Sequence, residues 1–221
     1  IRDSAYIGNA VPNNLHWLDV KKMRDAGFRI IRSAHYPQDP AFMDACDELG
    51  MFIIVATPGW QYWNPEPVFE ERILSDIRNM VRRDRNHPSV LLWEPVLNET
   101  AFPESFAQNA YRATHEEYPA PGCYAAIDDK SKGAMGYDVV YTAPKNEAFY
   151  RNAGKSCFTR EYGDCVDDWN SHNSYSRVAR EWGEEPQIRQ AQHYARKDYG
   201  GSLTVDQFYK SPRGHIGGAL W

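Results

Sequence analysis

The chain has 221 residues, of which 42% are hydrophobic and 14% aromatic, which is enough for one substantial core and too little for two large domains. Its formal net charge is −5 and its charged residues are interspersed, so the sequence lacks the basic stripe of a nucleic-acid-binding protein. Its apolar runs all fall short of the roughly 20 residues that a membrane-spanning helix needs, so we expect no membrane partner.

Helices and strands are predicted to alternate through the first half of the chain. Apolar residues at helical spacing indicate helices, and short β-branched runs indicate strands. Gly27 and Gly50 are each well placed to end a helix, and Pro40 to begin one. The predicted elements are a helix at 15–26, a strand at 28–33, a helix at 40–49, a strand at 51–55, a helix at 68–83 and a strand that begins after Pro88.

The second half continues the alternation less regularly. It predicts helices at 104–118, 147–152 and 188–199, and strands at 123–127, at 138–141, from 156 and in the closing segment 214–221. Alternation at this spacing predicts parallel strands with right-handed crossovers, in an open sheet or a closed (β/α) barrel. Polar or aromatic residues end several different strands, which favours the barrel, because an open sheet concentrates its ligand at one switch point. These residues are His35, Trp60, Asn98, Tyr141, Glu161 and Trp221.

Two carboxylates follow apolar strands in the same way. Asn98 and Glu99 come where one run stops, and Glu161 ends another, just before Gly163. A buried parallel strand exposes only its C-terminal tip to a substrate, so the pair suggests an acid/base and a nucleophile. The alternative is that they are two of 30 acidic residues in ordinary loops.

Five short motifs then occur in one order along nearly the whole chain. They are Arg32-Ser33-Ala34-His35-Tyr36-Pro37, Cys46-Asp47-Glu48-Leu49-Gly50-Met51, Asn86-His87-Pro88-Ser89, Asn98-Glu99 and Glu161-Tyr162-Gly163. In this combination the chain resembles glycoside hydrolase family 2, which includes β-galactosidases, β-glucuronidases and β-mannosidases. The resemblance implies a retaining exo-glycosidase on a (β/α)₈ barrel, normally preceded by β-sandwich domains.

The resemblance also assigns roles at the centre of the site. Glu99 matches the family's general acid/base, Glu161 its nucleophile, and Asn98 the amide that contacts the sugar's 2-hydroxyl. Arg32 matches the arginine that supports the nucleophile's charge. His35 matches a histidine that contacts the sugar.

Three further positions match residues around the sugar. Tyr141 matches the tyrosine that hydrogen-bonds the nucleophile, and Trp221 the tryptophan that ends the eighth strand. Asp3 shows the family's Asp-x-x-x-x-Gly spacing to Gly8, which implies contact with a sugar hydroxyl.

The chemistry of glycosyl transfer predicts how these groups divide the work. One carboxyl must be protonated to assist the leaving oxygen, and the other must be ionised to attack C1. We expect a guanidinium and a phenol to keep Glu161 charged, and a drier setting beside that negative charge to raise the pKa of Glu99. A retaining enzyme needs these carboxyl groups about 5 Å apart, whereas about 8 Å would mean inversion.

Other positions near the predicted site carry weaker signals. Thr57 stands where some relatives have an acidic ligand of magnesium, so we expect no magnesium and no cofactor. Trp60 and Trp63 are candidates for an aromatic wall of the sugar subsite, and core packing is the alternative for each. Glu94 is expected to form a structural ion pair on the strand face opposite Glu99.

The sequence therefore predicts a family 2 β-glycosidase barrel, with β-galactosidase as the first choice of activity. The alternatives are a β-glucuronidase or other β-glycosidase of the family, an endo-acting barrel glycosidase, and a non-catalytic carbohydrate-binding barrel. The chain begins at Ile1 in mid-pattern, so we expect a single barrel domain cut from a larger protein, without its first strand and its N-terminal β-sandwich domains. Such an open barrel exposes strand edges and is expected to be poorly stable alone.

Overall fold

The computed structural model describes residues 7–143, 146–162 and 215–220. Its helices are α1 (Asn13–Asp25), α2 (Pro40–Leu49), α3 (Pro67–Asp84), α4 (Glu104–Glu117) and α5 (Glu147–Asn152), with a 3₁₀ turn η1 (Ala134–Gly136). Its strands are β1 (Ile30–Arg32), β2 (Phe52–Ala56), β3 (Val90–Glu94), β4 (Ala126–Asp128), β5 (Val139–Tyr141), β6 (Ser156–Tyr162) and β7 (His215–Leu220). The predicted helix at 188–199 lies outside the described residues.

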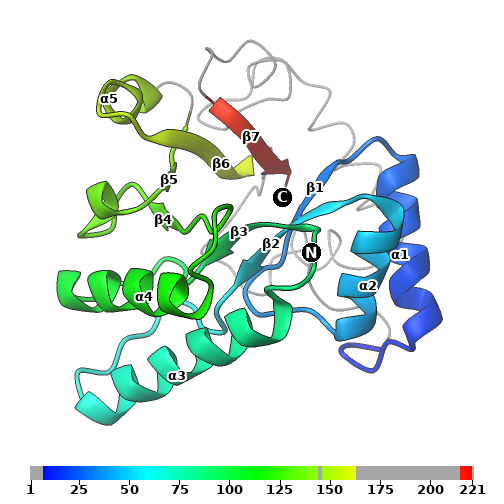
Figure 1. The fold of residues 1–221 in the computed structure, drawn as a ribbon, viewed down its shortest axis with the longest axis horizontal. Helices are drawn as coiled ribbons and strands as arrows, with labels where there is room; N and C mark the ends of the chain where they lie inside the picture. The colour runs from blue at the N-terminus through cyan, green and yellow to red at the C-terminus, as the bar shows by residue number, and fades with distance from the viewer. Residues whose placement is uncertain (1–6, 144–145, 163–214, 221) are drawn as a thin grey trace, which may run out of the picture.

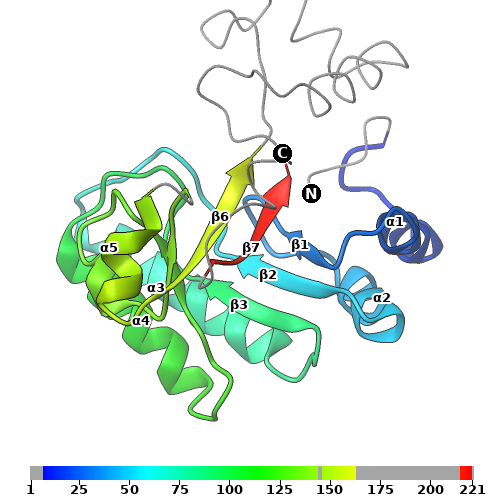
Figure 2. The same cartoon turned by 90° about the horizontal axis from the view of Figure 1, so that it is seen from above.

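The described strands are parallel, and within each sheet neighbouring strands pair in the order in which they occur along the chain. One sheet has the order β1-β2-β3 and the other β4-β5-β6-β7. A bridge between Trp93 and Ala125 connects them, supported by a 2.9 Å hydrogen bond from Trp93 N to Tyr124 O. The strands face one another around a common centre and the helices lie outside them (Figure 1). Figure 2 shows the same arrangement from above. The predicted alternating α/β architecture is confirmed.

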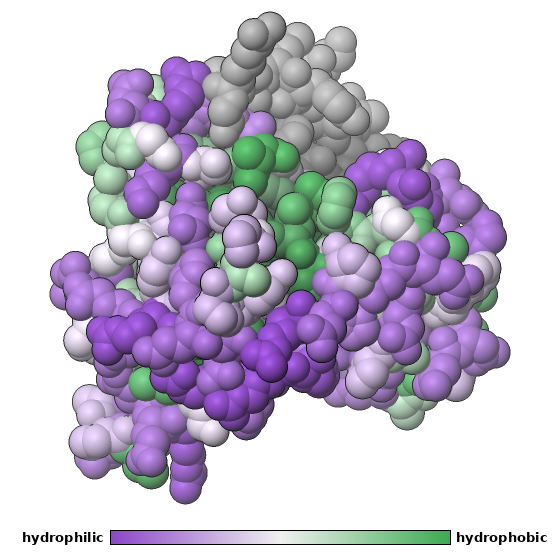
Figure 3. All heavy atoms as spheres, in the orientation of Figure 1, coloured by the Kyte–Doolittle hydropathy of each residue, from purple (hydrophilic) through white to green (hydrophobic). Residues whose placement is uncertain are grey.

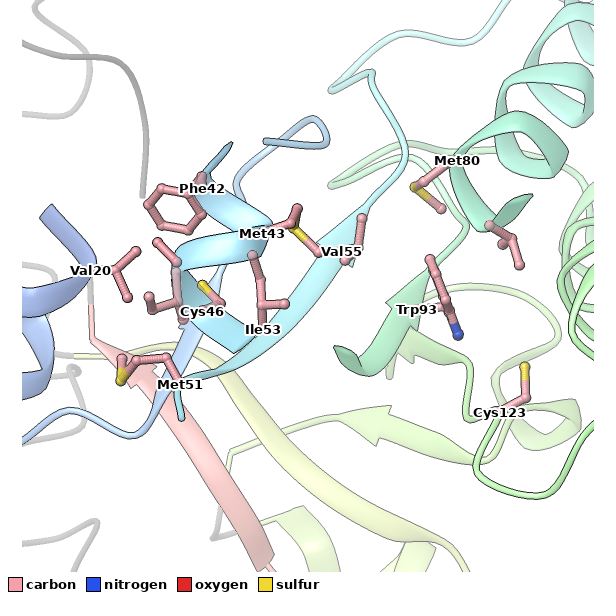
Figure 4. Close-up of a cluster of buried hydrophobic side chains, with 13 residues drawn as sticks. Val20, Phe42, Met43, Cys46, Met51, Ile53, Val55, Met80, Trp93 and Cys123 are labelled. Carbon is pink, nitrogen blue, oxygen red and sulfur yellow. The ribbon is translucent and has the colours of Figure 1, made fainter. Parts of the chain in front are cut away.

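Alternation along each strand separates an inner layer from an outer one. Ile54 packs in a cluster with Leu92 and Phe158, contributed by β2, β3 and β6. The residues on either side of Ile54 pack instead against the helices, in a second cluster. Figure 4 shows this outer cluster, with Ile53 and Val55 beside Phe42, Met43 and Cys46 of α2. Because consecutive strand residues point to opposite faces, the strands are hydrophobic on both sides.

Local sequence explains the limits of α2. The Asp39 side chain accepts a 2.8 Å hydrogen bond from Ala41 N, and Pro40 occupies the first turn. Gly50 ends the helix with φ +68, in the left-handed region that favours glycine. This helix has the predicted bounds, because both of its end signals are explicit in the sequence.

The outer helices present a polar surface to solvent. On α3, Arg82 pairs with Glu117 of α4 at 2.6 Å, and Arg78 pairs with Glu116 at 2.7 Å. Figure 3 shows hydrophilic side chains over this part of the molecule and hydrophobic ones concentrated nearer the middle of the same face. Among the described helices, none combines the length and the apolar character needed to cross a membrane.

Candidate active site

Arg32, the last residue of β1, is the centre of the candidate site. Its Nε and Nη2 donate to the two carboxylate oxygens of Glu94 at 2.7 and 2.5 Å, and its Nη1 donates to Glu161 Oε1 at 2.7 Å. The residue is buried, with 4% of its surface exposed. Burial by itself disfavours the charge, but the carboxylates, chiefly that of Glu94, outweigh it, so the pKa of Arg32 lies above its usual value. Arg32 therefore holds Glu94 and Glu161 in one network.

Glu94 is the buried partner in this network, and it changes the expected role of Tyr141. The Tyr141 hydroxyl donates to Glu94 Oε2 at 3.1 Å, so the expectation that this phenol supports Glu161 is wrong for the described structure. Burial, and then the negative charge of Glu94, raise the pKa of Tyr141 well above its usual value, so the phenol stays protonated and donates. The ion pair expected for Glu94 is confirmed, with Arg32 as its partner.

The expected position of Glu94 relative to Glu99 is also corrected. The expectation of opposite faces assumes a regular strand from Glu94 to Glu99, but β3 ends at Glu94 itself. Glu94 follows Leu92 on the inner face of the barrel, whereas Glu99 lies in the loop beyond. The backbone of Glu99 is in the left-handed region, with φ +47, which is uncommon for a residue other than glycine.

Glu99 accepts hydrogen bonds from two side chains. Gln61 Nε2 donates to its Oε2 at 2.7 Å, and Arg160 Nη2 donates to its Oε1 at 3.2 Å. Partial burial raises the pKa of this carboxyl, but the bonds from Gln61 and Arg160 outweigh burial, so the pKa of Glu99 is lowered. The expectation of a raised pKa for Glu99 is therefore wrong.

Arg160 lies between the two carboxylates, and the sequence interpretation missed it. Its Nη2 also pairs with Asp128 at 2.8 Å, and its Nη1 lies 3.5 Å from Glu161 Oε1 and donates to Asn98 Oδ1. Strict alternation along β6 would point Arg160 away from the face of Glu161. The pairing of β6 with β7 shifts register between Thr159 and Tyr162, and both side chains reach the site. The sequence signal that could have identified Arg160 is its position directly before the candidate nucleophile Glu161.

Asn98 and its neighbours complete the described site. Asn98 Oδ1 accepts a second hydrogen bond from Arg32 Nη2 at 3.1 Å. The backbones of Asn98 and Trp60 form a parallel bridge, and Gln61 N donates to Asn98 O at 3.0 Å. Trp60 is 49% exposed, and the centroid of its ring lies 5.8 Å from that of the His35 ring. An exposed aromatic face therefore stands beside the charged network.

The remaining predicted positions fall into three groups. Asp3 and Trp221 lie outside the described residues. Trp63 packs against Phe69 and Phe106, with ring centroids 5.4 and 4.8 Å away, so the core-packing alternative holds for it. Thr57 is buried, and its Oγ1 lies 3.9 Å from Met80 Sδ. In the part of the chain that the structure describes, no three His, Cys, Asp or Glu side chains gather as a metal site would require.

A comparison with protein families identifies the chain's relatives. The model of the TIM barrel domain of glycosyl hydrolases family 2 matches residues 2–119. A β-galactosidase of Thermoanaerobacterium thermosulfurigenes is 35% identical over 116 residues, which cover 52% of this chain and 16% of that protein. A putative β-glucuronidase of Formosa agariphila is 32% identical over 91 residues, or 41% of this chain and 11% of that protein. The chain thus spans less than a fifth of the length of either relative.

Solved structures share the fold of this chain. The β-glucuronidase 2 of Bacteroides uniformis, covalently bound to cyclophellitol-6-carboxylate aziridine, superposes with a TM-score of 0.71 at 20% identity, covering 100% of this chain and 29% of that one. A β-galacturonidase of Eisenbergiella tayi, bound to galacturonate, gives a TM-score of 0.65 at 23% identity, covering 97% and 41%. These likenesses show the barrel fold, and they include the described strands β4 to β7, which the family match over residues 2–119 does not reach.

Proposed function

Because the chain belongs to glycosyl hydrolase family 2, we propose that it carries the active site of a retaining β-glycosidase acting on terminal β-linked sugars. The observation that carries this proposal is the shared guanidinium: Glu99 and Glu161 both contact Arg160. Two carboxylates that contact one guanidinium lie near each other beyond the ends of different strands, and a double displacement at a sugar carbon uses two neighbouring carboxyl groups.

The proposed reaction has two steps, each using both carboxylates. In the first, the Glu161 carboxylate attacks C1 to form a glycosyl ester, while protonated Glu99 gives its proton to the departing oxygen. In the second, Glu99 takes a proton from water, whose oxygen attacks C1 and releases Glu161. Arg32 holds the attacking Glu161 carboxylate in place through the 2.7 Å contact, and Asn98 binds the sugar's 2-hydroxyl.

Arg160 sets a condition on the first step. Its contact with Glu99 stabilises the carboxylate, whereas a general acid must be protonated. The substrate therefore has to replace this contact, and excluding water from Glu99 then raises its pKa towards the range of a working acid. Asp128, 2.8 Å from the same guanidinium, is available to hold Arg160 when Glu99 is released.

The sugar is proposed from the names of the relatives. β-Galactosidases and putative β-glucuronidases occur among them at similar identity, and we place β-galactoside first and β-glucuronide second. An endo-acting glycosidase or a non-catalytic sugar-binding barrel is the alternative. The presence of both carboxylates with Asn98 favours a catalyst over a binding module.

A panel of 4-nitrophenyl β-glycosides, assayed with the full-length protein, tests the proposal. We expect one β-glycoside, first the galactoside, to be cleaved, and NMR to show the β-anomer of the sugar as the first product. Initial release of the α-anomer would contradict the retaining mechanism. Cleavage of polysaccharide without release of nitrophenol would favour the endo-acting alternative, and binding without cleavage would favour the binding module.

Gln61→Met is expected to change the pH profile of this activity. The Gln61 amide bonds the ionised form of Glu99 at 2.7 Å, so its removal raises the pKa of Glu99. Because the first step needs Glu99 protonated, the basic limb of kcat/KM should move to higher pH. Gln108→Met is the matched control, since the Gln108 amide bonds Glu104 on the exposed surface of α4. An unchanged basic limb in Gln61→Met would show that this bond does not set the pKa.

A further inference from the structure

A hollow of about 670 Å³ adjoins Glu99 outside the network centred on Arg32. The segment after β3, residues 99–103, forms one wall, and the rest is formed by Asp128, residues 130–132 and Arg160. Arg32, Asn98 and Glu161 do not line it. A general acid stands between the sugar and the group that leaves, so a hollow that touches only Glu99 of the two carboxylates lies on the leaving-group side.

The charges that line this hollow sum to a positive value. Glu99 and Asp128 are both paired with Arg160, at 3.2 and 2.8 Å. Lys130 and Lys132 also line the hollow, and in the described part of the chain neither ammonium group pairs with a carboxylate. Arg160, Lys130 and Lys132 together outweigh Glu99 and Asp128 by one positive charge, in a chain whose formal net charge is −5.

The loop that carries the two lysines is fixed at both ends. Asp128 Oδ1 accepts from Lys130 N at 3.3 Å, and Asp128 O accepts from Ser131 N at 3.0 Å, which closes a turn. Gly133, at φ +85, follows the turn and packs against α4. A Cβ at this position would lie 3.2 Å from Ala107 Cβ. A preorganised loop holds its charges at the hollow without a large ordering cost on binding.

We propose that this hollow is a leaving-group subsite that selects an anionic leaving group, one carrying a carboxylate or a sulfate. The proposal rests on the proposed glycosidase function and adds a substrate class to it. Lys130 and Lys132 attract the anion across the hollow, and the glycosidic oxygen then meets Glu99. The natural substrate is accordingly an acidic glycan or conjugate cleaved at the residue that precedes an anionic unit.

The test uses two aryl β-glycosides of the sugar found in the panel. One has 4-hydroxybenzoate as its leaving group and the other the methyl ester of 4-hydroxybenzoate, so the two differ chiefly in charge. In the full-length protein at low salt, we expect Lys130→Gln/Lys132→Gln to lower kcat/KM for the benzoate about three- to tenfold, the size expected of two exposed charge contacts. The ester should change less than about twofold. A glycoside of 4-hydroxyphenyl sulfate distinguishes sulfate from carboxylate.

Lys21→Gln/Lys22→Gln is the matched control, because it removes two charges from α1, on the other side of the molecule from α4 (Figure 1). An equal loss of benzoate activity in this control, or no loss in Lys130→Gln/Lys132→Gln, would overturn the subsite. Failure to cleave either substrate would instead contradict the glycosidase function. Titration of 4-hydroxybenzoate into wild type and the Lys130→Gln/Lys132→Gln protein then decides the anion site separately, and equal binding would reject it.

Discussion

Glu161→Gln in the full-length protein is expected to abolish hydrolysis of aryl β-glycosides, with kcat falling by at least about 10⁴-fold, the scale of losses when a covalent nucleophile is removed. The amide keeps the size of the side chain but cannot attack C1. Its hydrogen-bond acceptor can still face Arg32 Nη1, so the fold should persist. Steady-state kinetics with the best nitrophenyl glycoside measures the loss, and an unchanged melting temperature shows that the protein is folded.

Glu99→Gln should fail in a different way, and the contrast separates the two roles. Without a proton donor, substrates with poor leaving groups should lose most activity, whereas dinitrophenyl glycosides, which need no protonation, should still form the glycosyl enzyme. Glu116→Gln, on the exposed surface of α4, is the control and should retain full activity. If the losses in Glu161→Gln and Glu99→Gln depend equally on the leaving group, the assignment of acid and nucleophile is wrong.

Arg32→Met is expected to destabilise the fold by about 3–5 kcal/mol, because it leaves a buried carboxylate without its cation. Glu94, 2% exposed, would keep only the Tyr141 hydroxyl among the partners described here. Urea unfolding of the full-length protein measures the free energy. Lys21→Met removes the exposed Lys21–Asp25 ion pair of α1 and should cost less than about 1 kcal/mol.

The double variant Arg32→Met/Glu94→Gln identifies the cause of that loss. Glutamine removes the unpaired charge and keeps an oxygen for the Tyr141 hydroxyl, so the double variant should regain about half of the stability lost in Arg32→Met. Its activity should stay low, because Glu161 still lacks Arg32. If Glu94→Gln adds to the damage instead of relieving it, lost packing rather than an unpaired charge explains the effect of Arg32→Met.

The fold could be predicted because its strands and turns carry explicit local signals. Phe52–Ala56 is an apolar run that follows Gly50, and such runs are buried on both faces in a barrel. The alternation of elements then limits the topology to parallel strands. The short strand Ala126–Asp128 was predicted slightly early, because the preceding residues are also apolar and pairing with β5 alone decides where the strand begins.

The candidate site was predicted only in part, because its contacts depend on departures from regular geometry. Motifs identified Arg32, Asn98, Glu99 and Glu161, and the structure brings these four into one network. The partners of Arg160 depend on a register shift in β6, which alternation rules do not contain. Tyr141 was given the wrong carboxylate, since its position on an inner face does not say which of two neighbouring acids its hydroxyl reaches.

The backbone conformation of Glu99 sets two demands against each other. A side chain in the left-handed region at φ +47 costs about 1 kcal/mol relative to glycine. Folding alone would therefore prefer glycine or asparagine at the position where the proposed chemistry needs its general acid. Directed evolution that selected for thermal stability without also screening for activity would therefore favour replacing Glu99, which would give a more stable but inactive protein.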